Sequence, residues 1–166
     1  MESALIDLVV NRVIEEYVDE AEFYQNQLGL TKEEWEAWKK NQFVLPEFAN
    51  QQLIFLFSDY EWMLVQKVIR LTKMIPEKER QAVLEYRKMS AAIAKKWISF
   101  DLANIEIVEK MYNKKELEKY IQVKVVIDYN VWGYSDIISF TFPAVDRTRI
   151  ASSKRELIQL MTDIYE

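Results

Sequence analysis

Residues 28–46 contain a turn followed by a short helix, and this stretch constrains the fold more than any other part of the chain. Gly29 follows an apolar-periodic segment, which is where a helix commonly ends and the backbone turns. Thr31 and Glu34 have the spacing of a capping box, in which each side chain accepts a hydrogen bond from the backbone N–H of the other residue. Asn41 tolerates the left-handed conformation that ends a helix. The pattern predicts a helix over residues 31–40, joined by a tight turn to the helix before it.

Helical periodicity continues through the first two thirds of the chain. Ser58 and Glu61 form a second capping box, which should start a long helix. Asn113 with Glu116 could cap one further turn. Two glycines and three prolines among 166 residues favour a mostly helical chain with few tight loops. The helices that the apolar spacing predicts are 4–18, 19–28, 31–40, 46–57, 59–74, 77–98 and 102–112.

The apolar period changes from helical to alternating after residue 118. Apolar and polar side chains alternate over residues 121–129 and again over 138–142, which is typical of half-buried strands. Residues 130–133 should form the turn between the strands, and Ser153 with Glu156 should start a final helix. A two-stranded hairpin alone is marginally stable in water. We therefore expect the final helix to pack on it, or a partner to extend it.

These patterns together predict an α+β fold that is mainly α. We expect three segments: a bundle of short helices at 1–58, long central helices at 59–117, and a β-hairpin with its C-terminal helix at 118–166. Half of the residues are hydrophobic, yet no run of 18 apolar residues predicts a membrane span. The N-terminus lacks the pattern of a signal peptide, and the chain has no cysteine. We therefore expect a protein of the reducing cytoplasm.

Charge is distributed unevenly along the chain. Residues 1–58 contain 4 Lys and Arg against 11 Asp and Glu, a net charge of −7. Residues 59–166 contain 18 and 16, a net charge of +2. A protein that grips DNA places cations opposite the phosphates. The acidic first segment therefore weighs against DNA binding by that part of the chain.

Catalytic chemistry has little support in the sequence, and we expect no enzyme activity, cofactor or metal. The absence of histidine excludes Ser–His and Cys–His nucleophile systems and His-ligated zinc. Tyr120 and Lys124 have the spacing of a short-chain dehydrogenase pair, but they lie on a predicted strand without a dinucleotide fingerprint. The acidic cluster Glu15–Glu22 could hold a hard cation, but a solvated helix junction is the simpler explanation.

Two groups of aromatic residues are candidates for binding. Trp35 and Trp38 lie three residues apart on one helix face, so they could form a binding face, or Trp35 could anchor its helix in the core. Trp132 lies in the predicted hairpin turn beside Val131 and Tyr134, where apolar residues are unusual. The turn could fold back onto the protein. The alternative is that these three residues anchor an interface with a second subunit or another partner.

The first 58 residues resemble a Cro/repressor-type helix-turn-helix. That family has a Leu-Gly-Val-Ser turn followed by a recognition helix that ends in Ser-Arg-Trp; here Leu28-Gly29-Leu30-Thr31 matches the turn and Trp38 the tryptophan. The family places Ser, Arg, Thr or Gln at the exposed helix positions to contact bases and phosphates. In this chain those positions carry Lys32, Glu33, Glu34, Glu36 and Ala37.

A second resemblance covers more of the chain. The sequence is similar to dimeric anti-CRISPR proteins of streptococcal phages, which inhibit the Cas nuclease of type II-A systems. It also shares with them a hairpin followed by a helix that starts at Ser153. The matching blocks are Glu22-Phe23-Tyr24, Thr31-x-x-x-Trp35-x-x-Trp38-Lys39, Leu56-Phe57-x-Asp59-Tyr60-Glu61 and Lys67.

The resemblance implies a homodimer in the cytoplasm of a bacterial host, which binds the basic surface of the nuclease and lowers its affinity for target DNA allosterically. An acidic first segment suits a basic protein partner. The contact residues would be Glu33, Glu34, Glu36 and Lys40, and Val131, Trp132 and Tyr134 would form the dimer interface. The alternative is a dimeric transcription regulator that binds operator DNA through the same helix.

Overall fold

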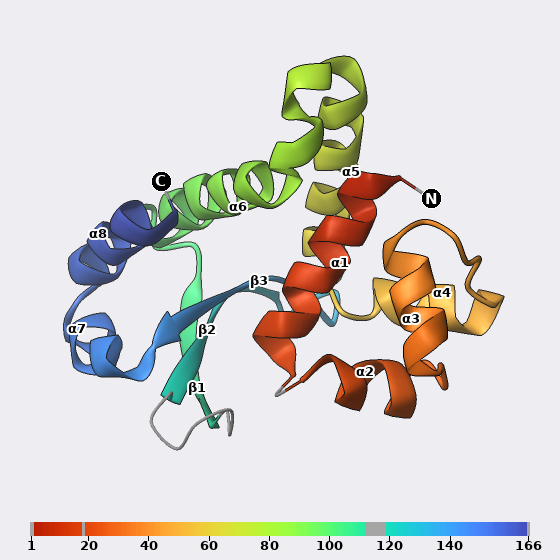
Figure 1. Cartoon of the computed structure of the whole chain (residues 1–166). Coiled ribbons are helices and arrows are strands. Elements are labelled where there is room, and N and C mark those ends of the chain that lie inside the picture. The colour runs from red at the N-terminus through yellow and green to blue at the C-terminus, as the bar shows by residue number, and fades with distance from the viewer. Residues whose placement is uncertain (1, 18, 112–118, 166) are drawn as a thin grey trace. The chain divides into compact units, whose positions relative to one another are not determined.

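The computed structural model describes residues 2–17, 19–111 and 119–165, and these form a mainly helical α+β fold, as predicted (Figure 1). The chain divides into two compact units. The first unit consists of Met1–Phe57 and Val65–Val83, and the second of Ser58–Leu64 and Leu84–Glu166. The division into three segments stays a prediction. Among the described residues, none of the helices combines the length and apolar character needed to cross a lipid bilayer.

The first unit is built from short helices packed around buried aromatic and aliphatic side chains.

The predicted start of a helix at residue 77 was wrong, because residues 76–81 form a 3-10 helix. That segment buries none of its side chains, so packing does not stabilise an α-helix there. The helices of this unit are α1 (Ser3–Glu16), α2 (Glu20–Asn26), α3 (Lys32–Lys39), α4 (Glu47–Ile54), most of α5 (Asp59–Met74) and η1 (Pro76–Gln81).

Arg12 of α1 is a buried cation that the sequence analysis did not single out. Its exposed fraction is 3%, and its guanidinium carbon lies 4.8 Å from the centroid of the Phe57 ring. Its Nη1 lies 3.7 Å from Oε1 of Glu16, one helical turn later. An aromatic face and a carboxylate thus stabilise a charge that would otherwise be costly to bury.

The second unit contains a three-stranded antiparallel sheet with the strand order β1-β2-β3. The register pairs Ile107 of β1 with Val123 of β2, and Val123 with Phe140 of β3. The short helix α7 was not predicted. The elements are α6 (Ala82–Ser99), which begins in the first unit, β1 (Asn104–Met111), β2 (Lys119–Tyr129), β3 (Tyr134–Pro143), η2 (Ala144–Asp146), α7 (Arg147–Ser152) and α8 (Lys154–Tyr165).

The predicted helix at 102–112 was wrong, because residues 104–111 form strand β1. Asp101 adopts a left-handed backbone with φ of 55° and separates α6 from this strand. Ile105 and Ile107 pair directly with Val125 and Val123 and are half-buried, so cross-strand contacts with β2 favour a strand here. The third strand therefore comes from the chain itself. The turn proposed at Asn113 and Glu116 lies outside the described residues.

The final helix packs on the sheet, as predicted. Its buried residues include Leu157 and Met161, on the same helix as Tyr165. The Tyr165 ring lies edge-on to Phe140 and Phe142, with centroids 5.3 and 5.7 Å away. Its hydroxyl accepts from the Thr141 N–H (3.2 Å) and donates to the Thr141 carbonyl (2.9 Å). One side chain thus joins the helix to the outer edge of β3.

The capping box of α5 contacts the same edge. Ser58 Oγ accepts from Glu61 N (3.2 Å), and Glu61 Oε2 accepts from Ser58 N (2.9 Å). Ser58 Oγ also donates to the Ile137 carbonyl (2.5 Å), and Glu61 Oε1 accepts from Ser139 N (2.8 Å). The motif that starts a helix therefore also satisfies backbone groups of β3 that would otherwise remain unpaired.

Candidate functional site

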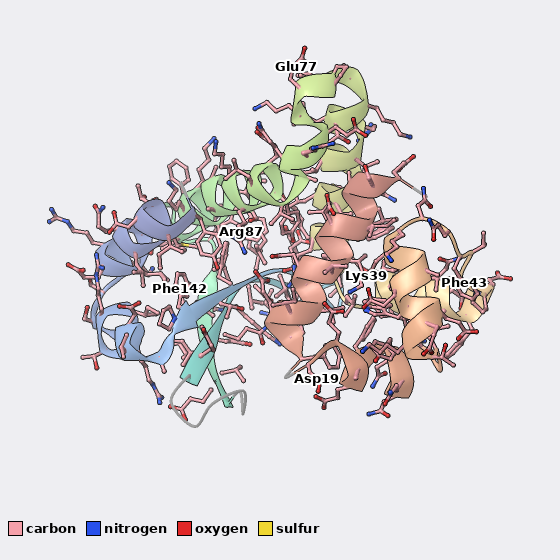
Figure 2. All side chains as sticks on the ribbon, in the orientation of Figure 1. Asp19, Lys39, Phe43, Glu77, Arg87 and Phe142 are labelled. Atoms are coloured by element: carbon pink, nitrogen blue, oxygen red, sulfur yellow. The ribbon has the colours of Figure 1, made fainter. Side chains whose placement is uncertain are left out.

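Local sequence signals position α3, the helix that carries the predicted contact residues. Asp19 Oδ1 accepts from Glu22 N (3.0 Å) and caps α2. Gly29 then adopts φ of 66°, which reverses the chain after α2. Thr31 and Glu34 form the predicted capping box, with bonds of 2.9 and 3.2 Å. Asn41 ends the helix with φ of 59°. Figure 2 labels Asp19 before α2 and Lys39 in the last turn of α3.

Trp35 and Trp38 fix one face of α3 in the core of the first unit. Their exposed fractions are 0% and 1%, and their rings stack with centroids 4.9 Å apart. Tyr24 stacks on Trp35 at 5.7 Å, and Phe23 meets Trp35 edge-on at 5.9 Å. The prediction of Trp35 as a core anchor is confirmed. Their burial makes the alternative, a binding face formed by the two tryptophans, wrong.

Glu20 of α2 is a positioning residue that sequence reasoning missed. Its Oε2 accepts from Trp35 Nε1 (2.7 Å) and from Lys39 Nζ (2.9 Å). Lys39 Nζ also lies 2.9 Å from Glu36 Oε1 and 6.0 Å from the Trp35 ring centroid. The buried indole N–H needs an acceptor, but the acceptor stands 15 residues earlier, a separation without any periodic signal.

The pKa of Lys39 lies above its ordinary value because of these carboxylates. Burial alone lowers the pKa of this ammonium group, since it disfavours the charged form. The hydrogen bonds to Glu20 and Glu36 and the attraction of both charges outweigh burial. Lys39 is therefore a fixed cation that holds α2 against α3 and neutralises part of the negative charge there.

Three of the four predicted contact residues lie on α3 and the fourth, Lys40, is its C-cap; they differ in exposure and in hydrogen bonding. Glu33 and Lys40 are exposed. Glu34 is partly exposed, and its carboxylate is used in the capping box. Glu36, with 45% of its side chain exposed, is paired with Lys39. The structure therefore leaves Glu33 as the most accessible carboxylate of the four residues.

Residues 19–40 carry six carboxylates and three lysines, a net charge of −3. Two of the six, Glu20 and Glu36, share the charge of Lys39. We use the name acidic face for the four carboxylates that Lys39 does not pair, of which Glu34 is partly exposed and the others are exposed: Asp19, Glu22, Glu33 and Glu34. A face of this kind attracts cationic surfaces and repels phosphate.

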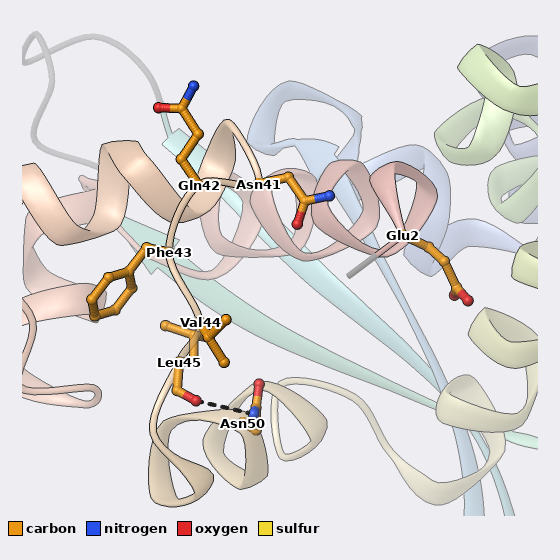
Figure 3. Close-up of a pocket in the computed structure, with 7 residues that line it drawn as sticks. All are labelled: Glu2, Asn41, Gln42, Phe43, Val44, Leu45 and Asn50. Carbon is orange, nitrogen blue, oxygen red and sulfur yellow. Dashed lines mark hydrogen bonds between the residues drawn. The ribbon is translucent and has the colours of Figure 1, made fainter.

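A hollow of about 760 Å³ in the first unit is lined mainly by residues that follow α3 in the chain (Figure 3). Asn50 Nδ2 donates to the Leu45 carbonyl across one side of it (3.4 Å). The Glu2 carboxylate lies 2.5 Å from Lys73 Nζ, so an ion pair holds it. The hollow thus offers amides and apolar side chains rather than a free acid or base. Its lining residues are Glu2, Asn41, Gln42, Phe43, Val44, Leu45 and Asn50.

The part of the chain that the structure describes contains no cluster of three or more His, Cys, Asp or Glu that could hold a metal ion.

In the second unit, the hairpin turn presents the other predicted interface residues. Val131 is 92% exposed, Trp132 70% and Tyr134 52%. These residues therefore project from the turn rather than fold back onto the unit.

No protein-family model, curated protein or solved structure matches this chain.

Proposed function

We propose that the protein binds a basic protein surface through the acidic face, and that this partner is the Cas nuclease of a type II-A system. On binding, the protein lowers the affinity of the nuclease for target DNA without occupying the DNA channel. It acts as a homodimer, as the resemblance implies. The exposed carboxylate of Glu33, on a helix anchored by two buried tryptophans, is the observation that supports this proposal most directly.

Electrostatics and rigidity both support a protein partner. A nuclease that handles nucleic acid has extended basic surfaces, which an acidic face attracts at long range. The capping box and the Trp35–Glu20 hydrogen bond hold α3 in place, so little conformational freedom is lost on binding. The same carboxylates would face phosphates in a DNA complex, and this repulsion disfavours the transcription-regulator alternative.

Charge reversal at one position tests the proposal against a matched control. Glu33→Lys should weaken binding to the nuclease about tenfold, mainly through slower association. Glu77→Lys makes the same charge change at another exposed position of the first unit and should have little effect. Binding is measured by surface plasmon resonance against a panel of type II-A nucleases. Inhibition is measured by cleavage of a target duplex.

Binding to duplex DNA separates the two functions. The inhibitor should show no affinity tighter than about micromolar for duplex DNA at physiological salt, whereas a regulator should bind more tightly with a steep salt dependence. Tight, salt-sensitive DNA binding without inhibition of any nuclease in the panel would overturn the proposal. Light scattering of the free protein measures its oligomeric state. If the protein inhibits the nuclease as a monomer, the homodimer part of the proposal is wrong.

A further inference from the structure

The turn between β2 and β3 carries three aromatic rings that stack on one another. We call Tyr129, Trp132 and Tyr134 the aromatic tip. Their ring centroids lie 4.9 to 6.1 Å apart, and their planes differ by 13° to 31°. Trp132 is 70% exposed, so stacking on the two tyrosines leaves most of its indole open to solvent. Such an exposed aromatic group in a turn is typical of a binding site rather than of packing.

The aromatic tip is held in its conformation before any ligand binds. The N–H groups of Trp132 and Gly133 both donate to the Tyr129 carbonyl, at 2.8 and 3.1 Å. Gly133 adopts φ of 71°, which closes the turn. The Tyr129 hydroxyl donates to Asp136 Oδ2 (3.1 Å), a bond that raises the pKa of Tyr129. A ligand therefore meets a preformed aromatic surface and loses little affinity to ordering it.

Two aspartates, Asp128 and Asp136, lie near the aromatic tip in the hairpin. Residues 125–142 contain no other charged residue. Asp136 pairs with Ile127 and therefore lies on the same face of the hairpin as Tyr129 and Tyr134, whereas Asp128 lies on the opposite face. With its amide oriented to donate, the Asn130 nitrogen lies 2.8 and 3.1 Å from the two oxygens of Asp128, which fixes that carboxylate beside the turn. Nucleic acid would stack on the rings, but its phosphates would meet these carboxylates, so the charge excludes it.

We propose that the aromatic tip binds an arginine side chain of a protein partner, with the guanidinium stacked on Trp132 and close to the carboxylate of Asp136. A guanidinium is planar and weakly hydrated, so it stacks on aromatic faces better than an ammonium. A second copy of this chain would bring the Asp136 carboxylates of the two chains together, and this repulsion disfavours a homodimer through the turn. The inference does not rest on the proposed function, because the acidic face belongs to the other unit.

A pair of peptides tests the proposal on the full chain. One peptide carries two arginines between glycines, and the other replaces both arginines with citrulline, which keeps the planar shape and removes the charge. The readout is the indole N–H signal of Trp132 in a nitrogen-15 NMR titration, assigned from its loss in Trp132→Phe. We expect the arginine peptide to shift this signal saturably, and the citrulline peptide to bind about fivefold more weakly or worse.

Variants locate the site and supply the control. Trp132→Ala should weaken binding of the arginine peptide about fivefold, and Asp136→Asn should weaken it by a similar factor. Phe100→Ala removes an equally exposed ring (71%) from the same unit and should leave binding unchanged. Equal binding of the two peptides, or equal weakening by Phe100→Ala, would overturn the proposal. A Trp132 signal that shifts with protein concentration alone would also overturn it, because a second copy would then occupy the aromatic tip.

Discussion

Replacing Glu61 with alanine should destabilise the protein far more than loss of a helix cap explains. Glu61 is 2% exposed, and its two carboxylate oxygens serve different backbone donors. Oε2 accepts from Ser58 N within the capping box, and Oε1 accepts from Ser139 N on β3. Glu61→Ala therefore leaves two N–H groups without their acceptor, one at a helix start and one at a sheet edge.

The size of the effect follows from these two bonds. A buried N–H that loses its partner costs about 1 to 3 kcal/mol. The Ser58 N–H, at a helix start, can regain water more easily than the Ser139 N–H on the strand. We therefore expect Glu61→Ala to lower the free energy of unfolding by about 2 to 4 kcal/mol. Glu61→Gln keeps one acceptor oxygen and points its amide group at the other donor, so its effect should be intermediate.

A second capping box in the same chain provides the control. Glu34 makes the equivalent bond to Thr31 N (2.9 Å), but that bond is exposed to solvent. Glu34→Ala should therefore cost less than about 1 kcal/mol. Urea unfolding followed by circular dichroism gives the free energies. Amide hydrogen exchange at Ser139 should speed up in Glu61→Ala and stay unchanged in Glu34→Ala. Equal losses of stability in the two variants, with Ser139 exchange unaltered, would refute the reasoning.

Three further predictions concern the first unit. Trp35→Ala removes a fully buried indole and should lower the free energy of unfolding by about 3 to 5 kcal/mol in urea titrations, and little change would contradict its role as an anchor. Gly29→Ala meets no atom within 4 Å, so only the left-handed backbone opposes it, and calorimetry should show a loss of about 1 kcal/mol. The pKa of Lys39 is raised in the folded state, so its pairing with Glu20 and Glu36 stabilises the protein fully below the ordinary value of 10.5 and is lost as pH rises through the folded pKa. Lys39→Met should therefore flatten the alkaline decline of stability above pH 10.5, and an unchanged slope would contradict this.

Short-range signals in the sequence predicted much of the helical structure. The capping boxes at Thr31 and Ser58 set the starts of α3 and α5, and both boxes are present in the structure. The predicted bounds of the long helix agree with α5 (Asp59–Met74). The left-handed backbone expected to end the helices is found at Gly29 and Asn41. Each of these features depends on residues within four positions of one another, so the sequence contains all the information needed.

Contacts between residues far apart in the sequence decided the features that the sequence did not predict. The apolar pattern of residues 104–111 fits either a helix or a strand, and pairing with β2 makes them a strand. The acceptor for the Trp35 indole, Glu20, stands 15 residues away, and the second bond of Glu61 reaches a residue 78 positions later. The burial of Arg12 against Phe57 likewise depends on a contact between residues far apart in the sequence. One-dimensional spacing cannot encode such partners, because only the folded backbone brings them within hydrogen-bonding or packing distance.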